Sequence, residues 1–120
     1  MRQGEGGVLD DILEDMAREE ALVQKQILDF LTSKGFIVVK FSQGAHAVRG
    51  GFIRTRKEDV GVSDIIGCTP DGRFICVEVK KPGGKASSEQ IAFLERVEAT
   101  GGVAILAESL GDVIQKLSFE

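Results

Sequence analysis

The sequence predicts an α/β layered domain with a central mixed β-sheet flanked by helices, whose elements follow the order αββββαβα. Apolar residues recur at helical spacing in several stretches, and short apolar runs rich in valine and isoleucine lie between these stretches. Glycine-containing segments separate the two kinds of pattern. At 120 residues, the chain is long enough for one hydrophobic core but not for two.

The first part of the chain is predicted to be helical in two pieces. Apolar residues at helical spacing within residues 8–16 indicate a short amphipathic helix. A broader apolar stripe indicates a second helix over residues 19–34. Carboxylates dominate residues 5–20 and are opposed there only by Arg18. We therefore treat residues 1–18 as an acidic N-terminal arm and residues 19–120 as the main domain.

The middle of the chain is predicted to form strands. Residues 36–42 and 52–56 each indicate a strand, and the glycine-containing segment between them indicates a loop. Two further apolar runs flank "TPDG" at residues 69–72. Proline suits the second position of such a turn, and glycine suits the left-handed residue that closes a three-residue loop. These two runs are therefore expected to pair as an antiparallel hairpin.

The last third of the chain returns to helical patterns. Ser87 is predicted to cap a helix that runs to about residue 100, with Gln90 at the reciprocal position of a capping box. Residues 103–107 are typical of a buried strand, and residues 110–117 indicate a final helix.

The predicted hairpin carries charges that buried strands do not ordinarily tolerate. Pairing outward from the turn places Asp64 opposite Glu78, and Lys80 follows on the same face. Two facing carboxylates repel each other, and a divalent cation removes the conflict. With the carbonyl oxygen of Val79, the pair offers hard oxygen donors that suit Mg²⁺ or Mn²⁺.

Such a site suits phosphodiester hydrolysis. The ion would polarise a phosphate, lower the pKa of a water and hold the leaving oxygen. Lys80 would orient or help deprotonate the attacking water, or stabilise negative charge in the transition state. A structural interpretation is also available, in which Asp64 starts a strand and Glu78 and Lys80 form an ordinary surface pair. An ExK triplet arises often by chance, whereas its placement opposite Asp64 across a hairpin is more specific.

Composition argues against several other classes of protein. No apolar run approaches the roughly 20 residues that cross a bilayer, and with no secretory pattern we expect a cytoplasmic location. The single histidine, His46, and the absence of a CxxC spacing argue against a Cys/His zinc site. Cys68 and Cys76 are expected to be reduced core residues. The net charge of −4 is not the usual footprint of a DNA-binding protein, but residues 40–57 carry only basic charges.

Taken in order, these motifs resemble the PD-(D/E)xK nuclease superfamily, and within it the VRR-NUC (virus-type replication-repair nuclease) domain. The resemblance rests on "GVSD" at residues 61–64 and "VEVKK" at residues 77–81. A helix with Glu and Gln precedes them, and an "SSEQ" helix start and a "GGVA" strand follow, so that the resemblance covers about residues 19–107. Ser63 replaces a proline that is common before the aspartate, at a position that shapes the backbone and does not bind metal. The resemblance implies a restriction-endonuclease-like fold and a metal-dependent DNA endonuclease.

The resemblance also implies site residues outside the hairpin. A glutamate on the first helix would complete the metal site; Glu20 borders the apolar stripe and is chosen over Glu19, which lies nearer the exposed side. In the family a glutamine on the later helix points into the active site, so Gln90 has this role as an alternative to capping. Gln24 is a weaker candidate of the same kind. The predicted catalytic residues are Glu20, Asp64, Glu78, Lys80 and Gln90, and the predicted metal ligands are Glu20, Asp64, Glu78 and the Val79 carbonyl.

Basic residues near the predicted site are candidates for contacts to DNA phosphates. They are Arg49, Arg54, Lys57 and Lys81, with Arg56 beside them; a solvated basic loop is the alternative for each. Stand-alone family members look like dimeric junction-cutting enzymes, so the expected substrate is branched DNA such as a Holliday junction, and the expected assembly is a homodimer. An exonuclease or flap nuclease of the same superfamily, and a catalytically silent nucleic-acid-binding module, are the alternatives.

Overall fold

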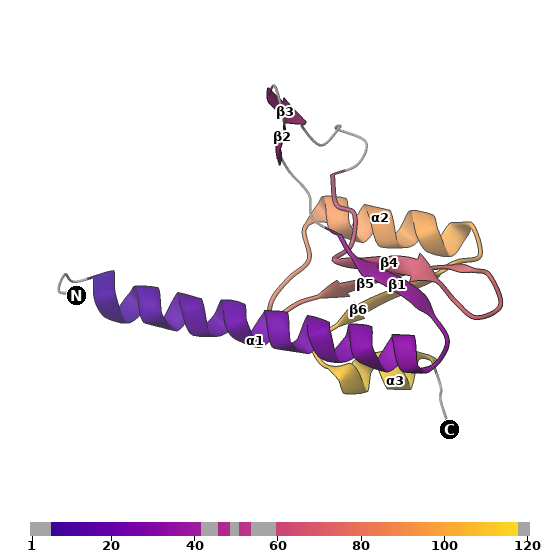
Figure 1. Ribbon diagram of the computed structural model, residues 1–120, viewed down its shortest axis with the longest axis horizontal. Helices are drawn as coiled ribbons and strands as arrows, with labels where there is room; N and C mark the ends of the chain where they lie inside the picture. Colours follow the sequence, from indigo (N-terminus) through magenta and orange to yellow (C-terminus); the bar gives the residue numbers. More distant parts are fainter. Residues whose placement is uncertain (1–5, 42–45, 49–50, 54–59, 118–120) are drawn as a thin grey trace.

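The chain folds as a mixed sheet between two layers of helix (Figure 1). The computed structural model describes residues 6–41, 46–48, 51–53 and 60–117. Strands β1, β4, β5 and β6 form a four-stranded sheet in that order, and β2 and β3 form a separate hairpin. In chain order the elements are α1 (Gly6–Ser33), β1 (Ile37–Lys40), β2 (His46–Val48), β3 (Gly51–Ile53), β4 (Ile65–Cys68), β5 (Phe74–Val79), α2 (Ser88–Ala99), β6 (Val103–Ala107) and α3 (Leu110–Leu117).

Different helices cover the two faces of the sheet (Figure 1). Helix α2 packs on one face, where Val97 meets Cys76 in a small apolar cluster. Helices α1 and α3 pack on the other face, where Ile27, Leu31 and Val113 are fully buried in the main core. Because period-2 alternation sends neighbouring strand residues to opposite faces, β4, β5 and β6 each contribute to both clusters. The predicted mixed sheet flanked by helices is confirmed.

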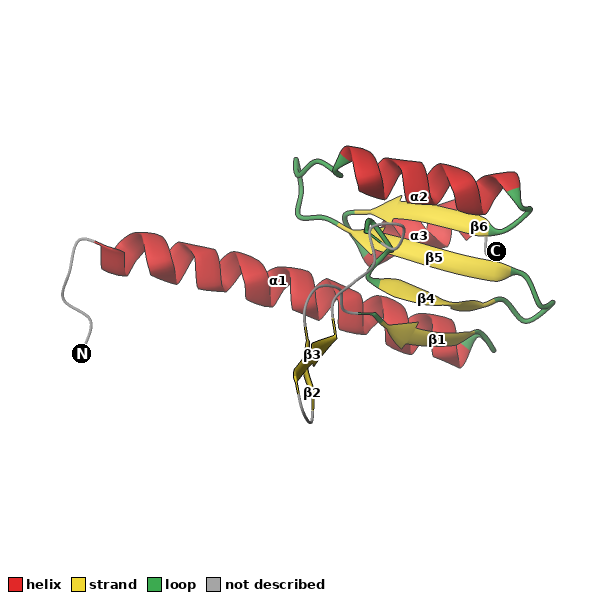
Figure 2. Cartoon of the chain, turned by 90° about the horizontal axis from the view of Figure 1, so that it is seen from above, coloured by secondary structure: helices red, strands yellow, loops and turns green. Residues whose placement is uncertain are grey.

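Helix α1 is one continuous helix of 28 residues, where the sequence predicts two helices. Nothing between Gly7 and Ser33 interrupts the backbone, since this stretch contains neither proline nor glycine. The helix stops where Gly35 adopts a φ of +89°, and the Phe36 N–H then donates to the Leu31 carbonyl at 3.0 Å. Its C-terminal half lies on the sheet, and its N-terminal half projects beyond the sheet (Figure 2).

The β4–β5 hairpin has the register that its turn predicts. Gly72 adopts a φ of +89°, and the Thr69 N–H donates to the Arg73 carbonyl at 2.8 Å. Ile66 lies opposite Cys76, as expected. Strand β1 pairs with β4 antiparallel, and β6 pairs with β5 parallel. The hairpin therefore occupies the centre of the sheet.

The β2–β3 hairpin corrects the predicted organisation of the middle segment. The sequence predicts a loop where β2 lies and a strand over residues 52–56, whereas β3 covers Gly51–Ile53 and pairs with β2. Strands of three residues contain too few alternations to reveal a period of two. Residues 54–59 lie outside the described part of the chain.

Both cysteines are free, as predicted. Cys76 is buried and lies opposite Ile66, whereas Cys68 is half-buried and lies opposite Phe74. The register thus keeps the two thiols apart. Among the described residues, no helix has the length and apolar character needed to cross a membrane.

Candidate active site

Asp64 and Glu78 lie side by side at one end of the central hairpin. Ile65 pairs with Val77, so the next position outward places Asp64 opposite Glu78. Asp64 accepts a hydrogen bond at Oδ2 from the Val79 N–H, at 2.9 Å. The aspartate side chain therefore satisfies a backbone N–H of β5 at the point where β4 begins. Because the N–H and C=O of a strand residue point to the same edge, the Val79 carbonyl lies on this edge too.

Glu78 is a buried carboxyl group with incomplete hydrogen bonding. Its side chain is 2% exposed. Its Oε2 accepts a hydrogen bond from Gln90 Nε2 at 3.0 Å and lies 3.5 Å from Lys80 Nζ. Its Oε1 is buried without a hydrogen-bond partner in the described structure. Burial, and then the adjacent charge of Asp64, raise the pKa of Glu78 to about 7, while Lys80 opposes the shift.

Gln90 makes the contacts of both interpretations that the sequence left as alternatives, the capping box and a bond to Glu78. Its Oε1 accepts a hydrogen bond from the Ser87 N–H at 2.8 Å, and its own N–H donates to Ser87 Oγ at 3.1 Å, which completes the capping box. Its Nε2 donates to Glu78. One side chain therefore fixes the start of α2 and the position of the buried carboxyl group.

Lys80 follows β5 at the mouth of the site. Its backbone N–H donates to the Ala107 carbonyl at 2.9 Å, which extends the β5–β6 pairing by one residue. Its side chain is 21% exposed, and its Nζ lies beside Glu78 Oε2. The buried carboxyl group of Glu78 thus has beside it an ammonium group that is partly open to solvent.

Helix α1 brings Glu20 and Gln24 toward the same region. Both line a hollow of about 410 Å³ together with Asp64. Glu20 also lines a smaller hollow of about 160 Å³ beside Val79 and Lys80. Glu19 is exposed and lines the smaller hollow but not the larger one. Gln24 has a buried Oε1 with no partner among the described residues, which places a polar atom in need of a donor in the wall of the hollow.

The structure does not gather three carboxylates into one closed cluster. Within the described ranges, no group of three or more His, Cys, Asp or Glu side chains is close enough to hold an ion. Asp64 and Glu78 are together, and Glu20 lies on the wall of the hollow that Asp64 lines. The role of Glu20 as a metal ligand therefore stays a prediction.

Two lysines line the hollows beside the site. Lys81 is exposed and lines the smaller hollow beside Lys80. Lys40, which the sequence did not single out, lines the larger hollow with Asp64. Its position follows from the β1–β4 register, in which Lys40 pairs with Ile65. Four predicted contacts lie outside the described residues: Arg49, Arg54, Arg56 and Lys57.

The comparison with protein families decides which group this chain belongs to. The pattern of the family described as "VRR-NUC domain" matches residues 38–110, which include Asp64, Glu78, Lys80 and Gln90. The chain belongs to the VRR-NUC family. Membership implies a nuclease-type function with DNA as substrate. The matched range leaves out Glu20 and Gln24 on α1.

Solved structures give the same family. A structure described as "VRR_NUC domain" is 25% identical in sequence, and the alignment covers 83% of this chain and 95% of that chain with a TM-score of 0.61. No curated protein matches this chain. The arrangement of sheet and helices is therefore that of a VRR-NUC domain.

Proposed function

We propose that the protein is a divalent-metal-dependent DNA endonuclease that hydrolyses phosphodiester bonds in branched DNA such as a Holliday junction. The observation that carries the proposal is the pairing of a buried glutamate with an aspartate. Glu78 keeps an unpartnered Oε1, and burial, followed by the adjacent charge of Asp64, raises the pKa of this carboxyl group. A pair of this kind is costly for a protein that uses it only for structure, since burying an incompletely paired carboxylate destabilises the fold.

The donor set fits Mg²⁺ or Mn²⁺. Both ions prefer hard oxygen ligands, and the site offers the carboxylates of Asp64 and Glu78 together with the Val79 carbonyl edge. Glu20, on the wall of the hollow that Asp64 lines, is the further proposed donor. When bound, such an ion polarises the scissile phosphate and lowers the pKa of a nearby water.

The other residues have roles that their positions favour. Lys80 reaches the site from solvent, so it is placed to orient the attacking water and to stabilise charge that develops on the phosphate. Gln90 holds Glu78 Oε2 by its amide and thereby positions that carboxylate. Lys40 and Lys81 line the two hollows and are proposed to contact the DNA backbone, together with Arg49, Arg54 and Lys57 outside the described residues.

A homodimer suits a substrate with two strands to cut. The projecting half of α1 carries Val8, Leu9, Ile12 and Leu13 at helical spacing, and each is between 50% and 73% exposed. An apolar stripe of this kind favours burial against another surface. We propose that a second copy covers it and thereby presents two sites to the arms of a junction.

Cleavage of defined DNA structures tests the proposal. Purified protein is incubated with a Holliday junction, a flap and a linear duplex, with and without Mn²⁺. Paired symmetric nicks in the junction support the proposal, whereas degradation from ends points to an exonuclease and cleavage confined to flaps to a flap nuclease. Asp64→Ala and Lys80→Ala should remove cleavage, and Glu95→Gln, a carboxylate change on α2 outside the site, should not. Failure of the wild type to cut any of the three would leave a silent binding module.

Metal binding has a readout that does not depend on cleavage. Mn²⁺ at about 100 times its Kd should stabilise the wild type by about 2.7 kcal/mol and raise its Tm. Glu78→Gln should lose most of this increase, while Glu95→Gln should keep it. An equal increase of Tm in both variants would place the metal elsewhere.

A further inference from the structure

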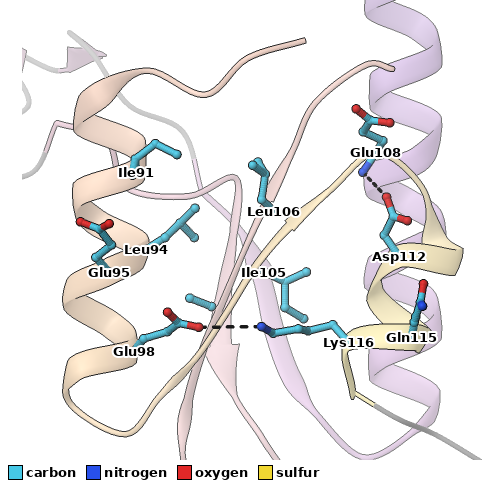
Figure 3. A pocket seen from close by; sticks show the side chains of 11 residues that line it. Ile91, Leu94, Glu95, Glu98, Ile105, Leu106, Glu108, Asp112, Gln115 and Lys116 are labelled. Atoms are coloured by element: carbon cyan, nitrogen blue, oxygen red, sulfur yellow. Dashed lines mark hydrogen bonds and ion pairs between the residues drawn. The ribbon is translucent and has the colours of Figure 1, made fainter. Parts of the chain in front are cut away.

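A groove follows the edge strand β6 on the opposite flank of the sheet from β1. Within the described residues, β6 pairs with β5 and forms one edge of the sheet. Helices α2 and α3, which pack on opposite faces, rise on either side of it (Figure 3). The groove has a volume of about 670 Å³. It is lined by Ile91, Leu94, Glu95, Glu98, Ala104, Ile105, Leu106, Glu108, Asp112, Gln115 and Lys116.

The floor of the groove combines apolar side chains with unpaired strand backbone. Leu106 is 47% exposed and Ile91 is 38% exposed, and both lie toward the groove (Figure 3). The Ala107 carbonyl accepts from Lys80 and so points to β5. Because successive strand residues point their N–H and C=O to alternate edges, those of Leu106 point outward. An edge of this kind is the template on which an extended peptide adds a strand.

The negative charge of the groove favours some binding partners over others. Glu95 and Glu98 lie on the α2 side, and Glu108 and Asp112 lie at the start of α3, whereas Lys116 is the only basic residue among the described residues of the lining. An acidic rim repels DNA phosphates. It also repels a second copy that presents the same edge, because two such rims would meet. A basic segment is the complement of this surface.

An ion pair crosses the groove at one end. Glu98 Oε2 lies 3.8 Å from Lys116 Nζ, and the two side chains are 56% and 52% exposed (Figure 3). Exposed pairs of this kind are weak, so a cation arriving from a partner can replace Lys116 at little cost. The groove thus offers Glu98 as well as Glu95 to an entering peptide.

We propose that this groove binds an extended basic peptide of a protein partner. The peptide pairs with the outer edge of β6, places an apolar side chain between Leu106 and Ile91, and directs lysine or arginine side chains to Glu95 and Glu98. Leu106 pairs with Glu78 in the β5–β6 register, so this docking surface neighbours the candidate active site, but its lining includes neither Asp64 nor Glu78 and binding there does not depend on nuclease activity.

Synthetic peptides on the full-length protein test the proposal. A fluorescent peptide of about eight residues, the length of an ordinary strand, carries one valine and two lysines at alternate positions, so that all three share one face, and is titrated with protein while anisotropy is measured. The matched peptides replace lysine by glutamate, or carry N-methyl groups on alternate backbone nitrogens. The basic peptide should bind about tenfold more tightly than either, because one loses the charges and the other loses strand pairing. If the N-methylated peptide binds as tightly as the basic peptide, strand addition is wrong. If the basic peptide does not bind, the proposed docking surface is wrong.

Protein variants separate the groove from general attraction to an acidic chain. The double change Glu95→Gln and Glu98→Gln should weaken binding about tenfold. The double change Asp10→Asn and Asp11→Asn removes the same charge from the projecting part of α1 and should leave the affinity within about twofold. Equal losses in the two variants would overturn the proposal. A second route uses Leu106→Thr, which removes the apolar side chain, places a β-branched residue that suits a strand, and should also weaken binding.

Discussion

The candidate active site and the groove beside β6 both contain carboxylates, but these carboxylates differ in their exposure to water. Glu78 on β5 is almost fully buried beside Asp64, and its pKa is raised to about 7. Glu98 lies on the groove beside β6, is about half exposed, and reaches a lysine across open solvent. Removal from water makes a carboxylate dependent on a nearby cation, whereas water alone supports an exposed one. The two kinds of carboxylate therefore suit the two roles that we propose, catalysis at Glu78 and peptide recognition at Glu98.

The largest difference between the two regions is expected in the rate of DNA cleavage. Asp64→Ala removes one of the two paired carboxylates and should reduce the rate of junction cleavage by about a thousandfold or more. Glu98→Ala should change the rate by less than about twofold, because its carboxylate lies in the groove. Initial rates in Mn²⁺ on one branched substrate measure both. Similar losses in the two variants would contradict the distinction.

The second prediction concerns the stability of the metal-free protein as pH rises. The folded state holds the Glu78 proton up to pH about 7, whereas the unfolded chain releases it near the ordinary glutamate pKa of 4.5. The folded state thus binds more protons between these values, so the free energy of unfolding should fall as pH rises through this window, by up to about 3 kcal/mol.

Glu78→Gln is the matched control for this pH dependence. The neutral amide cannot ionise, so the variant should be more stable than the wild type at pH 8 and should lose less stability between pH 5 and pH 8. Urea unfolding in a chelating buffer at several pH values measures the two slopes. A variant less stable than the wild type at pH 8 would mean that the ionised pair is structural.

The third prediction separates the two roles of Gln90. Gln90→Ala loses the hydrogen bonds to Ser87 and Glu78, and should cost about 1–2 kcal/mol of stability and reduce cleavage as well. Ser87→Ala loses the capping hydroxyl but keeps the bond to Glu78, and should cost about 1 kcal/mol with cleavage retained. Thermal unfolding and cleavage rates distinguish the variants. Equal cleavage by both would leave Gln90 as a cap only.

The smallest effect is expected at the exposed ion pair of the groove. Lys116→Ala should change the free energy of unfolding by less than about 0.5 kcal/mol, since both partners are half exposed. Chemical unfolding at low and high salt measures this change. A loss above about 2 kcal/mol would mean that the pair supports the groove.

The central hairpin could be predicted from sequence because its turn is chemically specific. Proline and glycine around Asp71 fix the loop, the loop fixes the register, and the register brings Asp64 opposite Glu78. Local rules of this kind need no knowledge of the rest of the fold. The capping box at Ser87 and Gln90 was predictable for the same reason.

Contacts between distant segments could not be predicted in this way. Lys40 reaches the hollow near Asp64 only because β1 pairs with β4, a pairing that no turn specifies. The two tasks of Gln90 were posed as alternatives, since sequence spacing cannot tell that one amide has room for both. The groove beside β6 depends on two helices packing on opposite faces, which is a property of the assembled domain.

The double attachment of Gln90 makes the first turn of α2 sensitive to events at the buried carboxyl group. The side-chain amide of Gln90 donates a hydrogen bond from Nε2 to Glu78 and accepts one at Oε1 from the Ser87 N–H. Any ligand that draws Glu78 Oε2 aside must also turn that amide and loosen its hold on Ser87. Exchange of the Ser87 amide proton with deuterium would then report occupancy of the site from a position outside it.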